Sequence, residues 1–435
     1  MCFFQCRAWA RLVIAPFVIM ASAAAMPSWA QDDNGVALEF DEAARLAVTA
    51  QPLLAGLDAQ QRASRESAVS AAQLPDPQLK VGIVDLPVNT GDAYSFTRDS
   101  DTQILVGVMQ EFPRARKRHL RGEIQEREAE RLGEDRGLVL RGIRRDVSLA
   151  WLDLWRYEQE LWLTRATLRE VETQMQAAEI ALRTGTATQA EFLAARQEVN
   201  RLQDAVRGAE QSGAHAHNAL SRWIGDAALR PVSPDLPVLP TLPPLQSVLE
   251  RAADHPQLAG AAAQVAVAQS NARLAKAAYH PDWRVELGYG YRPAFSEMVM
   301  LQVGVDLPVF TARRQDRDLA AALAQTEAAE SGVEDARRQL LSAARLHHHD
   351  YEHLVERLRD YDARLLRDSD ARVAAALAGW RSGRSLFREV LDARRAALEV
   401  RMSRLDLQHD LGKHFVELTY LGAFEGVGAG ETVHE

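Results

Sequence analysis

The segment RTGTATQAEFLAAR at residues 183–196 recurs without a gap as RSGRSLFREVLDAR at residues 381–394. Arginine, glycine, glutamate, leucine, alanine and a second arginine hold the same positions in both copies. Each copy follows a long stretch without proline, and its glycine suits a turn between two helices. The two segments therefore predict two helical hairpins, built from one unit that the chain contains twice.

Further matches extend this internal repeat toward the N-terminus. PLLAG at residues 52–56 recurs as PQLAG at 256–260, and VGV occurs at both 106–108 and 303–305. Between the halves, residues 231–244 contain six prolines, a composition typical of a stiff, extended linker. The chain is therefore divided into a first repeat at 31–230, a linker at 231–244, a second repeat at 245–424 and a flexible tail at 425–435.

Both repeats predict the same order of elements. Apolar residues alternate with other residues in short runs, and such alternation predicts strands. The expected elements before the hairpins are helical segments at about 38–73 and 245–278, and strand pairs at 79–84 with 103–108 and at 284–291 with 298–305.

The hairpins should be unusually long. Proline is absent between Pro113 and Pro231 and again after Pro308, so nothing in these stretches breaks a helix. Residues 114–183 would form a limb about 105 Å long at roughly 1.5 Å per residue. Spacings of three and four residues predict coiled-coil packing through Leu154, Tyr157, Leu161, Thr164, Leu168, Val171, Met175, Ala178 and Leu182, and through Phe192, Ala195, Val199, Leu202, Val206 and Ala209.

The first thirty residues read as a signal peptide. Arg7 and Arg11 precede an apolar run at residues 12–25, and Ser-Trp-Ala at 28–30 is typical of a cleavage site. The only cysteines, Cys2 and Cys6, lie before that site. We therefore expect an exported chain with no disulfide, no cysteine metal site and no cysteine lipid anchor.

Composition excludes several functions. The net charge is −9, which argues against nucleic-acid binding. No nucleophile motif or phosphate loop is present, so we expect no enzyme and no cofactor. Four strands cannot close a barrel, and open sheet edges in lipid are costly, so strands in a membrane would require partner chains. Three chains would supply twelve strands.

The repeat, the strand pairs ending in VGV and a proline, and the hairpin tips together resemble the TolC family of outer-membrane efflux proteins. The resemblance implies an α+β membrane protein. Its homotrimer forms a 12-stranded β-barrel that continues into a periplasmic α-helical coiled-coil barrel. It also implies location in the outer membrane of a Gram-negative bacterium. The implied function is the exit duct of a tripartite pump with an RND-type inner-membrane transporter and a periplasmic adaptor.

The segment LPDPQL at residues 74–79 resembles the corresponding segment in the branch of the family that exports heavy-metal cations, and it indicates such a cargo. Two alternatives stay open. The same duct can serve drug efflux or type I protein secretion, and a periplasmic coiled-coil scaffold without a pore would share the long helices.

The resemblance also assigns site residues. Glu389 and Asp392, with Glu191 at the equivalent place in the first repeat, match the acidic gate of the pore. The alternative is that these acids solvate helix starts. The family's gate arginine has no clean match, because Ser385 falls there with Arg384 and Arg388 nearby. Turn-permitting residues predict adaptor docking at the tips through Thr184, Gly185, Thr186, Ser382, Gly383 and Arg384.

Two further groups stand out. His349 and His353 lie four apart on a predicted helix and form a weak candidate for a metal site, against a solvated or inter-helix face. Basic residues follow each strand pair where they oppose the helix dipole, so we expect headgroup or inter-subunit contacts or simple solvation. They are Arg114, Arg116, Lys117 and Arg118, and Arg313, Arg314 and Arg317.

Overall fold

The computed structural model describes residues 37–49, 51–89 and 91–424. The predicted signal peptide and the predicted tail lie outside these residues. The first half contains α1 (Phe40–Thr49), α2 (Pro52–Ala71), β1 (Gln78–Val84), β2 (Gln103–Phe112), α3 (Ala115–Arg183), α4 (Gln189–Ile224) and the short η1 (Gly225–Leu229). The second half contains α5 (Leu245–Ala253), α6 (Pro256–Ala277), β3 (Trp283–Tyr291), β4 (Met298–Val305), η2 (Thr311–Arg313), α7 (Gln315–Asp360), η3 (Tyr361–Leu365), α8 (Leu366–Arg381) and α9 (Phe387–Tyr420).

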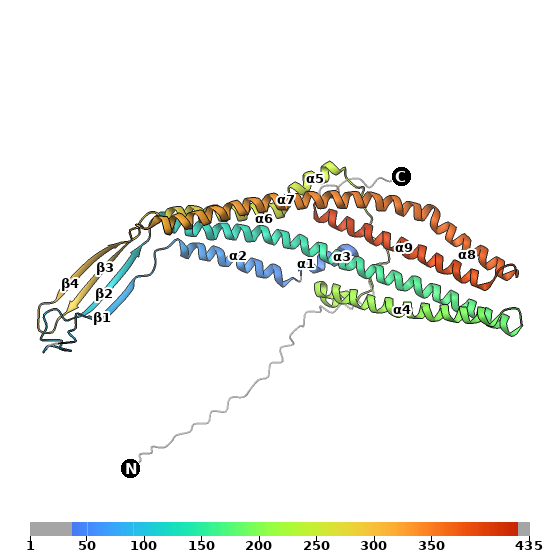
Figure 1. Cartoon of the computed structure of the whole chain (residues 1–435), viewed down its shortest axis with the longest axis horizontal. Helices are drawn as coiled ribbons and strands as arrows, with labels where there is room; N and C mark the ends of the chain where they lie inside the picture. Colours follow the sequence, from blue (N-terminus) through green and yellow to red (C-terminus); the bar gives the residue numbers. More distant parts are fainter. Residues whose placement is uncertain (1–36, 50, 90, 425–435) are drawn as a thin grey trace, which may run out of the picture. The chain divides into compact units, whose positions relative to one another are not determined.

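The two halves thus repeat one order of elements (Figure 1). Each expected N-terminal helical segment is divided in two, and the second helix begins with proline, Pro52 in α2 and Pro256 in α6. Proline is favoured there because its missing N–H lies in the first turn, where no partner is needed. The long limb of the second hairpin is also divided, because the π-helical turn η3 interrupts it between α7 and α8.

The four strands form one antiparallel sheet in the order β1-β2-β3-β4. Because directly paired residues share a face, the register sorts the side chains into two sets. One face is almost entirely apolar and carries Leu79, Val81, Ile83, Ile104, Val106, Val108, Phe112, Trp283, Val285, Leu287, Tyr289, Tyr291, Val299, Leu301, Val303 and Val305, with Gln110 paired to Val285. The opposite face carries mainly polar residues, methionines and glycines, with Val84 and Leu105 among them. Lys80 Nζ lies 2.5 Å from Glu286 Oε2 there.

The helical hairpins turn at equivalent glycines. Gly185 follows α3 with φ +74°, and Gly383 follows α8 with φ +71°. This left-handed conformation suits glycine, which has no Cβ to clash with the backbone. The predicted coiled-coil positions Val171 and Ala178 in α3 and Ala195 and Leu202 in α4 are buried. Among the described residues, no helix has the length and apolarity needed to cross a bilayer.

A tryptophan-rich core lies where α1, α3 and the linker meet. Trp151 and Leu152 of α3 are fully buried, and the Trp151 ring meets Phe40 edge-on at 5.4 Å. Trp151 Nε1 donates to the Leu38 carbonyl at 2.9 Å, and Trp155 Nε1 donates to the Pro234 carbonyl at 2.8 Å. These bonds satisfy the indole N–H groups and fix the proline-rich segment against α3.

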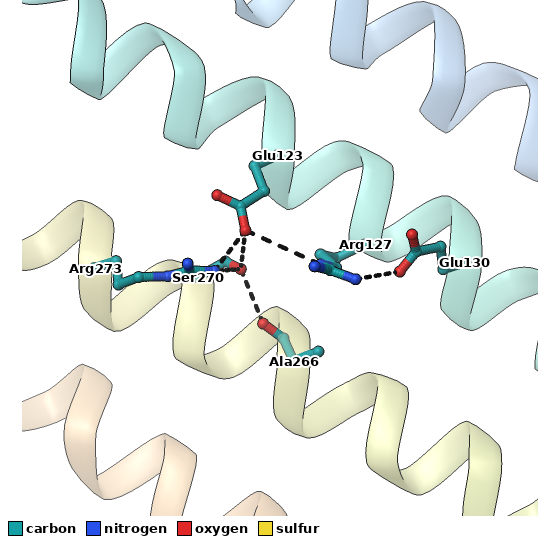
Figure 2. A network of polar contacts seen from close by, with 6 residues as sticks. All are labelled: Glu123, Arg127, Glu130, Ala266, Ser270 and Arg273. Atoms are coloured by element: carbon teal, nitrogen blue, oxygen red, sulfur yellow. Dashed lines mark hydrogen bonds and ion pairs between the residues drawn. The ribbon is translucent and has the colours of Figure 1, made fainter.

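A polar network joins the two repeats near the sheet. Figure 2 shows Glu123 of α3 facing Ser270 and Arg273 of α6. Arg273 Nη2 lies 2.5 Å from Glu123 Oε1, and Arg127 Nε lies 4.0 Å from the same oxygen. Ser270 is buried and donates to the Ala266 carbonyl at 2.9 Å. The helix of one repeat is therefore held against the helix of the other beside the sheet.

Candidate functional site at the hairpin tips

The first tip is built around a capping box. Thr188 precedes α4, and its hydroxyl accepts from the Glu191 backbone N–H at 3.3 Å. Glu191 Oε2 in return accepts from the Thr188 backbone N–H at 2.9 Å. This reciprocal pair satisfies two N–H groups that a helix start leaves without partners.

Glu191 also connects the two tips. Its Oε1 accepts from the backbone N–H of Phe387, the first residue of α9, at 3.2 Å. The bond from Thr188 lowers the pKa of Glu191 most, and the Phe387 bond adds to this against the effect of burial. Both carboxylate oxygens are therefore engaged in shaping the tips.

The second tip departs from this arrangement although the sequence repeats. Leu386 takes the place of Thr188, and its side chain offers no cap to α9. Glu389, the counterpart of Glu191, is exposed, and its carboxylate has no hydrogen bond or ion pair within the described part of the chain. Asp392 is exposed on the same helix face, 3.8 Å from both Arg388 and Arg395. Glu389 and Asp392 thus lie on one face of α9, whereas Glu191 binds the backbone of Thr188 and Phe387.

Behind the tips, ion pairs link the hairpins to each other. Glu198 of α4 is 5% exposed, and Arg201 Nη2 and Arg395 Nη2 lie 2.5 Å and 2.6 Å from its two carboxylate oxygens. Burial alone would raise the pKa of Glu198, but the hydrogen bonds from the two arginines outweigh it and lower the pKa. A second ion pair joins Glu170 of α3 to Arg394 of α9.

These linking arginines were missed by the sequence analysis, which looked for a gate arginine near Ser385. Arg394 and Arg395 lie nine and ten residues after Ser385, within α9. The arginine shared by the repeated segments, Arg196 and Arg394, is a signal for Arg394 only. A groove of about 630 Å³ between α4 and α9 is lined by Glu191, Glu198, Arg201, Arg388, Asp392 and Arg395 among others.

The predicted docking residues are exposed at both turns. Thr184 and Thr186 use their hydroxyls inside the first turn, with bonds of 3.1 Å to the carbonyls of Ile180 and Ala181. Ser382 donates to the Gly379 carbonyl at 3.0 Å in the second turn, and Arg384 is exposed beside it. The tips are therefore well-defined turns with exposed surfaces.

The histidines of α7 point in different directions. His349 and His353 are exposed, with ring centroids 4.3 Å apart. Among the described residues, no three or more histidine, cysteine, aspartate or glutamate side chains gather into a metal-binding group. His347 turns the other way, and its Nδ1 lies 3.0 Å from Nδ1 of His414 on α9. The hydrogen-bond contact therefore joins His347 of α7 to His414 of α9, and it does not involve the predicted pair His349 and His353.

Comparison with known proteins agrees with the fold. Residues 248–422 match the family model described as outer membrane efflux protein. No curated protein sequence matches significantly.

Solved structures extend the likeness over most of the chain. CusC superposes with a TM-score of 0.72 at 17% identity, covering 89% of this chain and 93% of that one. A membrane protein from Pseudomonas aeruginosa gives 0.74 at 18% identity, covering 94% and 96%. VceC, an outer membrane protein from Vibrio cholerae, gives 0.70 at 16% identity, covering 88% and 96%. The predicted TolC-like fold is confirmed, and the matched family is one of outer membrane proteins.

Proposed function

We propose that this chain, which has the fold of the outer membrane efflux proteins, is the exit duct of a tripartite efflux pump. Three copies would form the duct. A periplasmic adaptor would connect it to an RND-type transporter of the inner membrane. The observation that carries this proposal is the sheet, with one face that is almost entirely apolar and one that is mainly polar.

The apolar face is built for lipid. Its residues come from all four strands, and most of them are exposed. A soluble protein rarely exposes so large a continuous apolar surface. Strands that alternate apolar and polar residues are typical of a wall with lipid outside and water inside. The opposite face, with the Lys80–Glu286 ion pair, suits the water-filled side.

The sheet also requires copies of itself. In the described part of the chain, β1 and β4 are the edge strands, each paired on one side only. An unpaired backbone group in lipid costs several kcal/mol. Pairing of β4 with β1 of a neighbouring copy removes both edges, and three copies give a barrel of about twelve strands.

The acidic tip supports a gate. In a homotrimer, Glu389 and Asp392 from three copies would face a common axis. Like charges repel, by about 1 kcal/mol per pair at 4 Å in water. The ring would therefore attract cations. Glu191 would hold the tips in place, and the Glu198–Arg395 and Glu170–Arg394 pairs would keep the hairpins closed.

For the cargo, we favour heavy-metal cations. The support is LPDPQL at residues 74–79, between α2 and β1, and an acidic tip that suits cations. Drug efflux and protein secretion use the same architecture. Loss of resistance to heavy-metal salts in a deletion strain supports the metal assignment, whereas loss of drug resistance alone overturns it.

The membrane assignment has a sharper test with matched variants. Leu301 lies on the apolar face opposite Leu287, and its neighbour Gln302 lies on the polar face opposite Glu286. A lysine facing the middle of a bilayer costs about 2–4 kcal/mol, whereas the water-filled side tolerates it. Leu301→Lys should therefore abolish trimers in the outer-membrane fraction, and Gln302→Lys should keep them. Equal behaviour of the two variants would contradict the proposal.

A further inference from the structure

The apolar surface continues past the end of β4 toward the helices. Leu307, Val309 and Phe310 follow the strand and are 68%, 69% and 76% exposed. A backbone bond from Asp306 N–H to the Asp282 carbonyl, at 2.9 Å, keeps this segment beside the start of β3. These exposed apolar residues therefore adjoin the face assigned to lipid at the end of the sheet nearest the helices.

Aromatic rings mark the same level. Trp283 begins β3 on the apolar face, and its ring stacks on that of Phe112 with centroids 5.2 Å apart. Trp283 pairs with Val305, the last residue of β4. Tryptophan and tyrosine gather where a membrane protein passes from hydrocarbon to headgroups. Phe112, Trp283 and Phe310 thus place the headgroup level at this end of the sheet.

Immediately beyond, three arginines are exposed and available. Arg313, Arg314 and Arg317 have no side-chain hydrogen bond or ion pair within the residues that the structure describes. They lie at the start of α7, where positive charge opposes the helix dipole, so helix stability does not explain them. The nearby carboxylate of Asp316 is already engaged, because Tyr279 donates its hydroxyl to it at 2.5 Å.

The opposite end of the sheet differs in charge. Its loops carry Asp85, Asp92, Asp99, Asp101 and Glu297. Both of its arginines are committed to backbone oxygens: Arg98 donates to Gly91 at 3.1 Å, and Arg292 donates to Ser296 and Ser100 at 2.6 Å and 2.7 Å. Available cations are therefore found at the helix end of the sheet and not at the loop end.

A groove joins the apolar and basic residues. It has a volume of about 460 Å³ and is lined by Leu307, Val309, Phe310 and Arg314, with Lys117 and Asp282 among its other residues. Lys117 Nζ donates to Asp282 at 2.8 Å and to the His280 carbonyl at 2.6 Å, so this lysine is neutralised inside the groove. Asp306 also lines the groove, and its carboxylate lies 3.5 Å from Arg284. Arg314 is left as the available cation beside Leu307, Val309 and Phe310.

We propose that this groove and the arginines beside it bind an anionic phospholipid of the inner leaflet. The acyl chains would lie against Val309 and Phe310, and the phosphate would bind Arg313, Arg314 and Arg317. This inference rests on the proposed placement of the sheet in the membrane.

Lipid retention by the purified trimer tests the site. Cardiolipin, phosphatidylglycerol or phosphatidylcholine is added in detergent, and bound lipid is counted by native mass spectrometry. Each arginine near an anionic headgroup contributes about fivefold to binding. Arg313→Gln, Arg314→Gln, Arg317→Gln should therefore weaken binding of the two anionic lipids at least about tenfold. Phosphatidylcholine binding should not change.

The control replaces three exposed arginines further along the same limb, Arg337, Arg357 and Arg367, by glutamine. This variant should bind lipid as the wild type does. Unchanged cardiolipin binding by the first variant overturns the proposal. So does its dissociation into monomers, because the arginines would then serve contacts between subunits. Competition by inorganic phosphate alone would show an ion site without lipid and would also overturn it.

A spin label measures the depth independently. The only cysteines precede the predicted cleavage site, so Phe310→Cys gives a single labelling position in the cleaved chain. In liposomes the label should be more accessible to oxygen than to a water-soluble nickel chelate. Asp335→Cys on α7 is the exposed control and should show the reverse. If both labels behave alike while trimers still form, the lipid site is refuted and the proposed duct is not. Failure of the wild type to enter liposomes refutes the duct itself.

Discussion

Arg395 of α9 lies 2.6 Å from the buried carboxylate of Glu198 on α4, so one ion pair joins the two hairpins just behind their tips. Arg201 holds the other oxygen of the same carboxylate. Removing Arg395 leaves Glu198 only partly compensated in a buried position, which costs free energy. Since Arg395 is itself half-exposed, the cost should be on the order of 1 kcal/mol.

Arg395→Gln should therefore loosen the second hairpin and raise the open fraction of the channel by about fivefold. Recordings of single channels in planar bilayers measure this fraction. Arg196→Gln is the matched control, because Arg196 is exposed on α4 and has no ion pair in the described part of the chain. An open fraction that changes equally in both variants would show that the pair does not hold the tips closed.

The acidic tip residues should set cation selectivity. Replacing Glu389 and Asp392 by alanine removes the negative charge that would surround the pore entrance, and it should lower selectivity for cations and weaken block by divalent cations. Reversal potentials in a salt gradient measure the effect. Glu399→Ala, at an exposed site further along α9, should leave both properties unchanged. If the double variant keeps wild-type selectivity, these carboxylates are ordinary helix-start charges.

The first tip has a capping box and the second does not, so a single substitution should add one to the second tip. Leu386 has φ −79° and ψ 150°, close to the −88° and 155° of Thr188, and its side chain is 63% exposed. Leu386→Thr should therefore form a second capping box with Glu389 and stabilise the start of α9 by about 1 kcal/mol. Hydrogen exchange at the tip would report this as slower exchange. Cation selectivity should fall, because Glu389 would turn toward the cap. Unaltered exchange would contradict the cap.

The His347–His414 pair predicts acid sensitivity. Burial is the main cause that lowers the pKa of both residues, and for His414 the proximity of His347 adds to it, although Asp350, Glu417 and Asp410 act in the opposite direction. In the unfolded chain histidine has a pKa of about 6.5, so below that pH the unfolded state binds more protons. Stability should be unaffected by this pair above pH 6.5 and should fall as the pH drops toward the folded-state pKa values.

Replacing both residues by glutamine removes the titrating groups. The change in melting temperature between about pH 7 and pH 5 should then become smaller. His353→Gln, at an exposed site on the same helix, should keep the wild-type change. An equal acid response in the double variant and the wild type would place the acid sensitivity elsewhere.

The turns should be where the adaptor binds. Single cysteines at Thr186 and Arg384 should crosslink to an adaptor in cells, because both residues are exposed at the ends of the hairpins. Val238 of the linker is 96% exposed and serves as the control position. Crosslinking that occurs only at Val238 would show that the adaptor binds the linker instead.

Local patterns in the sequence predicted most of the fold. Proline positions and apolar spacing indicated the hairpins, and alternation indicated the four strands. The Glu191 cap was also within reach, because Thr188 stands three residues before Glu191, as in other capping boxes. Contacts between distant segments were not. Arg395 and Glu198 are 197 residues apart, and His347 and His414 are 67 apart. Such pairs depend on how helices pack, which periodicity does not specify.

The π-helical turn at Tyr361–Leu365 was likewise not predicted. The sequence gives no signal for this turn, because proline is absent from α7, η3 and α8 alike. A local change from α to π spacing depends on packing against the neighbouring helix. Arg404 of α9, which lies 2.5 Å from Asp362 within this turn, is one such contact.

In the proposed assembly, the two-faced sheets and the hairpins of three chains form one water-filled duct through the outer membrane. Single-channel conductance of the purified trimer in planar bilayers tests it most directly. Discrete conductance steps are expected from the wild type and from Gln302→Lys, and none from Leu301→Lys, which places charge on the lipid face. A trimer that inserts but conducts no ions, even when Arg395→Gln loosens the tips, would contradict it.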